Sequence, residues 1–152
     1  MAETLGSLCD KLTIVKLKQY HTENEGKLLS LKKQQDQLIT EIEEFISDAV
    51  SGTIPVNRLT FRSNKVFKSQ NNKVRKIEGT IGYVFGKLAE INCLLWHEQE
   101  KVYEFEKVPI LEKNRVVKQL GILNLERVSC IDKIDANFVK LVRKKKLNLR
   151  CK

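Results

Sequence analysis

Two stretches of the chain, TLGSLCDKLTIVKLKQYH (4–21) and TIGYVFGKLAEINCLLWH (80–97), decide the fold because they are copies of one pattern. A shift of 76 positions also superimposes the two histidines of the chain, His21 and His97. The same shift pairs identical residues at four further places: Thr4 with Thr80, Gly6 with Gly82, Lys11 with Lys87, and Leu12 with Leu88. Each copy opens with a threonine, which is a good N-terminal cap for a helix. The chain therefore contains a duplicated helical unit.

A second correspondence follows each copy, now at a shift of 92 positions. The spacing of three and four residues places each row on one helix face. Every apolar position of one row meets an apolar position of the other, and Gln35 meets Arg127. The first row is Leu28, Leu31, Gln35, Ile39, Ile42, Ile46 and Ala49, and the second is Leu120, Leu123, Arg127, Ile131, Ile134, Phe138 and Leu141. The second copy is thus 16 residues longer, and we place the extra residues around Val108-Pro109.

These patterns predict four helices, over about 3–24, 27–50, 77–107 and 111–146, with Gly26 and Pro109 at two tight hairpin turns. Each hairpin has an apolar stripe that it cannot bury alone. We therefore predict an all-α, four-helix bundle of two antiparallel hairpins with pseudo-two-fold symmetry. Residues 1–152 form one domain, with hairpin repeats at 3–50 and 77–146, a basic connector at 51–76 and a basic tail at 140–152. Gly82 and Gly86 share one helix face, which predicts a close contact between helices.

Composition limits the class of protein. An apolar fraction of 41% and a charged fraction of 31% are typical of a globular chain. No apolar run reaches the roughly 20 residues that a transmembrane helix needs, and the N-terminus has no signal-peptide pattern, so we expect a cytoplasmic protein. The four cysteines lack the spacing of zinc ligands. We expect reduced thiols, no bound metal and no cofactor.

The net charge of +9 is concentrated in two segments without acids. Without these segments, 14 basic and 19 acidic residues remain, so the helical body carries a net charge of −5. Such segments either solubilise the chain or bind an anionic partner, including nucleic acid. The basic residues are Arg58, Arg62, Lys65, Lys68, Lys73, Arg75 and Lys76 in the connector, and Lys140, Arg143, Lys144, Lys145, Lys146, Arg150 and Lys152 in the tail.

The repeat resembles a family of short bacterial helical proteins of unknown function, often encoded near genes for lipopolysaccharide and surface-sugar synthesis. The stretches that carry the resemblance are TIGYVFGKLAEINCLLWHEQEK (80–101), LNLERVSCIDKID (123–135) and the first copy at 4–24. The chain departs from the family pattern at Lys16, where an asparagine is usual, and at Gln99, where an acid is usual. The resemblance implies a bacterial cytoplasmic helical protein, and it implies no reaction.

Polar residues interrupt the apolar rows and suggest a site inside the bundle. A guanidinium on a core-facing row needs an acid or hydrogen bonds to satisfy it. We hypothesise one polar layer across the bundle, in which a histidine beside a carboxylate acts as a general acid or base and Arg127 holds a phosphate or carboxylate. Its members are His21, Glu25, Gln35, His97, Glu100, Asn124 and Arg127. The alternative is that these residues border the core and form structural ion pairs.

Three functions remain open at this stage. The first is a non-catalytic accessory protein that engages a protein partner, a second copy or an anionic partner, in bacterial surface-polysaccharide metabolism. The second is a small enzyme, or a binder of sugar phosphates or nucleotides, that uses the polar layer. The third is nucleic-acid binding through the basic connector and tail, which contain two phenylalanines, Phe61 and Phe67, among the basic residues of 61–76.

Overall fold

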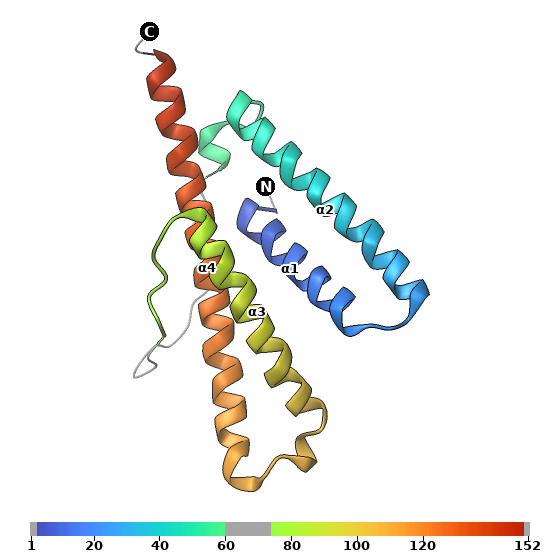
Figure 1. Ribbon diagram of the computed structural model, residues 1–152. Helices are drawn as coiled ribbons and strands as arrows, with labels where there is room; N and C mark the ends of the chain where they lie inside the picture. The colour runs from blue at the N-terminus through green and yellow to red at the C-terminus, as the bar shows by residue number, and fades with distance from the viewer. Residues whose placement is uncertain (1–2, 60–73, 151–152) are drawn as a thin grey trace.

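The computed structural model describes residues 3–59 and 74–150, and within these ranges it contains helices and no strand. The protein is an all-α, four-helix bundle, as predicted. Figure 1 shows two antiparallel hairpins, α1 with α2 and α3 with α4, docked side by side. The elements are α1 (Leu5–His21), α2 (Glu25–Ser51), the short 3-10 helix η1 (Val56–Arg58), α3 (Ile81–Tyr103), the short 3-10 helix η2 (Phe105–Lys107) and α4 (Ile110–Arg150).

The two repeated threonines cap their helices as expected. Thr4 accepts a hydrogen bond from the Ser7 backbone N–H at 3.1 Å, and the Ser7 hydroxyl accepts one from the Thr4 N–H. Thr80 accepts from the Tyr83 N–H at 3.4 Å at the start of α3. These caps satisfy backbone donors that a helix N-terminus leaves without partners. The repeat therefore begins with the same local structure in both copies.

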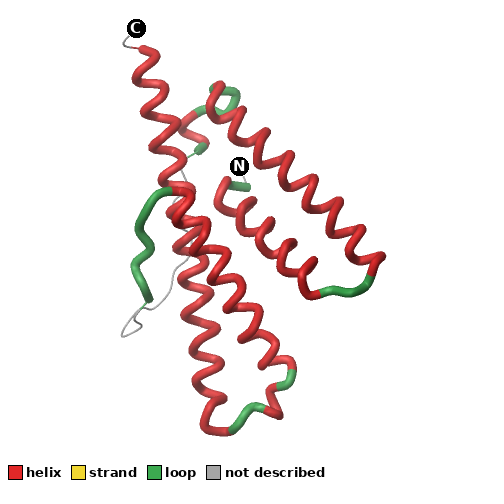
Figure 2. Tube along the Cα trace, in the orientation of Figure 1, coloured by secondary structure: helices red, strands yellow, loops and turns green. Residues whose placement is uncertain are grey.

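Helix α4 is the longest element and forms the spine of the core. Its N-terminal half packs along α3, and its C-terminal half continues beyond α3 to meet the ends of α1 and α2 and the 3-10 helix η1 (Figures 1 and 2). Phe138 on α4 packs on Phe45 of α2, with ring centroids 6.0 Å apart. The fully buried members of this core are Ala49, Val84, Leu88, Leu123, Cys130 and Ile134.

Several predicted boundaries need correction. Gly26 lies inside the first turn of α2, and the first hairpin turns through residues 22–24, where Asn24 caps α2 by accepting from the Lys27 N–H at 2.9 Å. The extra residues of the second copy lie in a longer α3, in the link with η2, and in an earlier start of α4. Residues 140–150 of the basic tail are helical, since α4 continues to Arg150.

The two hairpins do not dock symmetrically. Helix α1 packs against α4, whereas the equivalent pair, α3 and α2, makes little contact and stands apart in Figure 1. The bundle thus has one open side, between α2 and α3 over α1. In the described ranges, no helix combines the length and the apolar character that crossing a membrane requires.

Candidate functional site

A buried ion pair joins α1 to α4. The Asp10 carboxylate is only 4% exposed, and it accepts hydrogen bonds from Arg127 Nε at 2.9 Å and Arg127 Nη2 at 2.5 Å. Arg127 retains 34% of its side-chain exposure. The bond to Asp10 raises the pKa of the guanidinium, which therefore stays charged. Two parallel bonds between a guanidinium and a carboxylate fix distance as well as orientation, so this pair locks α1 onto α4.

Helix α3 takes part in the same cluster through Asn92, which is 1% exposed. Its Nδ2 donates to Asp10 Oδ1 at 2.9 Å and to Thr13 Oγ1 at 2.7 Å, and the Thr13 hydroxyl donates to the Asp10 backbone carbonyl. Asn92 Oδ1 is buried and has no hydrogen-bond partner within the described part of the chain. The cluster is therefore a structural junction of α1, α3 and α4 whose polar groups are, with that one exception, satisfied.

One turn nearer the N-terminus of α1, a glycine allows α4 to come close. A Cβ on Gly6 would lie 2.5 Å from the Ile131 backbone oxygen, so no other residue fits there without a shift of α4. The Gly6 N–H donates to Asp135 Oδ1 at 2.7 Å. Burial raises the pKa of Asp135, and the bond from Gly6 opposes that effect. Helix α1, the first helix of the first repeat, therefore packs on α4, the second helix of the second repeat, through Gly6 and Asp135.

The repeat explains why the other side is open. The position of Asp10 in the second copy is Gly86, and the position of Arg127 in the first copy is Gln35. A glycine and an amide cannot form an ion pair, so α3 and α2 have no equivalent lock. Gln35 instead accepts a hydrogen bond from Lys16 Nζ at 2.8 Å, which directs it toward α1. These two differences leave α3 and α2 of one chain without the ion pair that joins α1 to α4.

The open side forms a largely apolar groove of about 400 Å³. Ile39 on its α2 wall is 44% exposed, and Cys93 on its α3 wall is also exposed. We call this feature the α2–α3 groove. It is lined by Leu12, Thr13, Lys16, Leu17 and Tyr20 of α1, Gln35 and Ile39 of α2, and Phe85, Ala89 and Cys93 of α3.

The prediction of a close helix contact at Gly82 and Gly86 is wrong for the described structure. No atom of another described helix lies within 4 Å of where a Cβ on either glycine would be. Helical spacing places both on the same side of α3 as Ala89 and Cys93, which line the groove. The close contact occurs at Gly6 instead, because only the first copy has a helix docked on this face.

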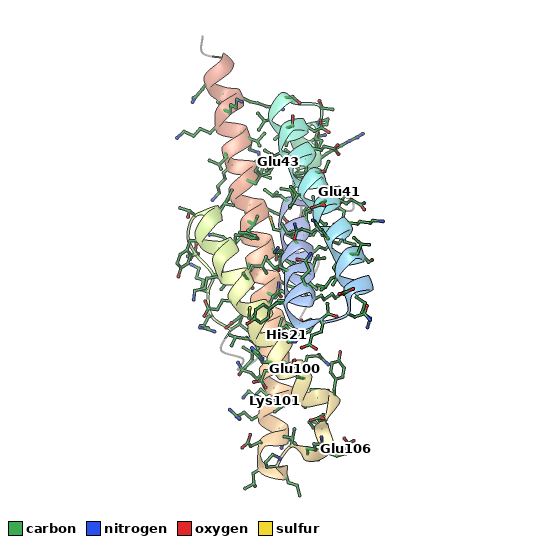
Figure 3. All side chains as sticks on the ribbon, turned by 45° about the vertical axis from the view of Figure 1, so that its right-hand side comes forward. His21, Glu41, Glu43, Glu100, Lys101 and Glu106 are labelled. Atoms are coloured by element: carbon green, nitrogen blue, oxygen red, sulfur yellow. The ribbon has the colours of Figure 1, made fainter. Side chains whose placement is uncertain are left out.

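The single polar layer that we predicted is not present, although some of its members do meet. His21 stacks on Trp96 with ring centroids 4.8 Å apart, and His97 lies edge-on to His21 at 6.2 Å. Glu100 accepts from Trp96 Nε1 at 2.9 Å and lies 3.6 Å from His97 Nδ1. In Figure 3, His21 lies at the turn between α1 and α2, and Glu100 lies just below it on α3.

Arg127 does not join these histidines, since both its Nε and Nη2 are bound to Asp10. Gln35 is bound to Lys16, Glu25 is exposed at the start of α2, and Asn124 is exposed and donates to the Leu120 carbonyl. Asp10 thus takes two of the guanidinium donors that we assigned to a ligand carboxylate or phosphate. His97 is 63% exposed, so the histidine group lies in solvent and not inside the bundle.

The connector contributes a second ion pair, between a buried acid and an exposed arginine, that we did not predict from the sequence. Glu126 is 2% exposed, and it accepts from Arg75 Nε at 2.9 Å and from Arg75 Nη2 at 3.1 Å. This pairing raises the pKa of Arg75. Adjacent residues of α4, Glu126 and Arg127, thus fix the end of the connector and α1. The available signal was Glu126, three residues after the core residue Leu123, which helical spacing places on the same side of α4.

The predicted anion-binding residues have different environments. Arg75 is committed to Glu126, and Lys76 lies 3.1 Å from Glu78. Arg58 and Arg143 are exposed, Lys144 and Lys145 are exposed on the last turns of α4, and Lys146 is half-buried beside Gly52. Arg62, Lys65, Lys68 and Lys73 lie outside the described residues. The basic charge that is free to meet an anion is therefore smaller than the sequence suggests.

The thiols and acids of the described chain form no cluster of three or more groups that could hold a metal ion. Burial is the main reason that the pKa of Cys9 and that of Cys130 rise to about 11. Both thiols are thus protonated near neutral pH and unreactive as nucleophiles. Comparisons with protein-family models, curated proteins and solved structures gave no match to this chain.

Proposed function

We propose that the chain is a non-catalytic interaction protein that binds an amphipathic helix of a protein partner in the α2–α3 groove. The observation that carries the proposal is an apolar groove left open where the internal repeat would place a helix. An amphipathic helix in an apolar groove is a common mode of protein recognition. Gly82 and Gly86 lie on the same face of α3 as the groove-lining Ala89, and their lack of side chains allows the backbone of such a helix to approach closely.

The chemistry of the groove supports protein binding over catalysis. Its lining is largely apolar, and among its polar members Lys16 and Gln35 bind each other while the Thr13 hydroxyl donates to the Asp10 backbone carbonyl. The polar groups that suggested catalysis lie elsewhere, and Arg127 is occupied by Asp10. The resemblance of 80–101 to a family encoded near surface-sugar genes directs the search for partners to bacterial surface-polysaccharide synthesis. A cytoplasmic accessory protein of that pathway is the function that we propose.

Site-specific photo-crosslinking tests the proposal. A benzophenone amino acid replaces Ile39 in the groove, or Leu29 on the exposed face of α2 as a control, and the chain is irradiated in living cells. We expect a covalent protein adduct from position 39 whose cross-linked peptide maps to a helix, and none from position 29.

Two glycine variants provide the matched controls. Gly86→Lys should abolish the adduct because it fills the groove wall, whereas Gly121→Lys, at another open position on α4, should retain it. An adduct that persists in Gly86→Lys, or no adduct from position 39, would refute docking in the groove.

A further inference from the structure

The internal repeat identifies the kind of helix that the groove fits. Within the chain, α1 receives α4 in antiparallel orientation, with Gly6 against the Ile131 backbone and with Asp135 accepting the Gly6 N–H. Helix α3 is the copy of α1, and Gly82 stands at the position of Gly6. The same face of α3 has no helix on it. Its matching partner is a helix with the contact residues of α4.

The chain itself contains a second helix of that kind. Helix α2 is the copy of α4, and the shift of 92 positions places Ile39 at the position of Ile131 and Glu43 at that of Asp135. Both side chains are exposed, so they are available to another molecule. Glu43 lies on α2 well away from the histidine end of the bundle (Figure 3). A Glu43 carboxylate can accept the Gly82 N–H, as Asp135 accepts that of Gly6.

The α2 of the same molecule does not fill this position. Its Leu31, Phe45 and Ala49 are buried, and its Gln35 is bound to Lys16 of α1. The hairpin turn at 22–24 joins α2 directly to α1. Helix α2 is thus committed to α1 along one face, while its Ile39 and Glu43 face remains open toward the groove.

Resting on the proposed docking function, we infer that the partner is a second copy of this chain. Each copy lays the Ile39 and Glu43 face of its α2 on the Gly82 and Gly86 face of the other copy's α3. The two contacts are identical and related by a two-fold axis, so the assembly closes as a dimer. The dimer covers both grooves. In it, each α3 packs against an α2 of the other copy, as α1 packs against α4 within one chain.

Sedimentation over a concentration series tests this inference. We expect the mass of the wild type to rise from 17.6 kDa to twice that value, and Gly121→Lys to behave in the same way. Gly86→Lys should remain at the single-chain mass throughout, while its helical circular dichroism and melting temperature show that it is folded. A wild type that stays monomeric at every concentration would overturn the inference, and so would dimerisation that Gly86→Lys leaves unchanged.

Cross-linking identifies which helices meet. Gln35→Cys and Gly86→Cys are combined, with Cys93→Ser and Cys151→Ser to remove competing thiols, and treated with a short bismaleimide. The pairing of Asp10 with Arg127 predicts that these two positions meet between copies, so a two-chain product is expected. A product within one chain would mean that α2 closes on its own α3, and no product would mean that the helices do not meet; either result overturns the inference.

The two proposals can fail separately. The chain could cross-link from position 39 to a helix of another protein and still be strictly monomeric in sedimentation. That result would support the docking function and overturn the self-association. Loss of any adduct at position 39 removes the docking function itself. An adduct to a second copy of this chain that Gly86→Lys abolishes supports both.

Discussion

Replacing Arg127 with methionine should weaken the protein strongly, because it leaves the buried Asp10 carboxylate without its cation. Methionine keeps much of the aliphatic volume of the arginine and removes both hydrogen bonds to Asp10. Removing one partner of a buried ion pair costs about 3–5 kcal/mol. Arg127 is partly exposed, so water can solvate some of the vacated site, and we expect a loss of roughly 2–4 kcal/mol in the free energy of unfolding. That loss is a large fraction of a typical stability of about 5–15 kcal/mol.

The assay is urea denaturation followed by circular dichroism, with the free energy of unfolding extrapolated to water. Asp10→Asn and the double variant complete a mutant cycle that isolates the interaction between the two side chains. We expect the double variant to be more stable than the sum of the single losses predicts, because neither charge is then left alone. Single losses of less than about 0.5 kcal/mol that simply add would refute the lock between α1 and α4.

Three further predictions follow from the same packing. Gly6→Ala should destabilise the protein by about 1–3 kcal/mol because its Cβ would lie 2.5 Å from the Ile131 backbone oxygen. Gly121→Ala, at an open helical position, should stabilise the protein by about 0.5–1 kcal/mol. The melting temperatures of the two variants and the wild type measure both effects. Asp135→Asn keeps an acceptor for the Gly6 N–H and removes a carboxyl whose pKa is raised by burial. The free energy of unfolding of the wild type should therefore fall as the pH rises from the unfolded-state pKa of Asp135 to its folded-state pKa. Urea titrations at several pH values should show this fall in the wild type and not in the variant. In dilute, monomeric protein at neutral pH, iodoacetamide should alkylate the exposed Cys93 well before Cys9 and Cys130, as peptide mass mapping would show. Equal labelling of the three thiols would contradict the burial of Cys9 and Cys130.

Much of the fold could be predicted from the sequence because each helix predicted in one copy of the repeat has a matching helix in the other copy. The paired rows from Leu28 and from Leu120 both form helices, and the capping threonines stand where the repeat placed them. These features depend on local spacing and on apolar periodicity. Such signals lie within a few residues of each other, so a single sequence contains them.

The arrangement of the two hairpins could not be predicted in the same way. It depends on Asp10 meeting Arg127 from a distant part of the chain, and the repeat aligns Asp10 with a glycine. Antiparallel pairing within each predicted hairpin places His97 near the level of Arg127, and for that reason we predicted one polar layer that contains both. The histidines do converge with each other, because identical positions on α1 and α3 lie at one level of the bundle. The available signal of asymmetry was that Asp10 and Arg127 are charged in one copy only, since their counterparts are Gly86 and Gln35.

The central claim is that the α2–α3 side is open because it lacks the polar lock that joins α1 to α4. Installing that lock tests it most directly. Gln35→Arg combined with Gly86→Asp places an arginine and an aspartate at the positions equivalent to Arg127 and Asp10. The measurement is the rate at which a maleimide labels Cys93 in dilute, monomeric protein, with Gly86→Asp alone as the control.

We predict that the double variant labels Cys93 much more slowly than the wild type, because α2 closes over α3, and that the control labels at the wild-type rate. Equal rates in the double variant and the wild type would show that the missing ion pair does not hold this side of the bundle open.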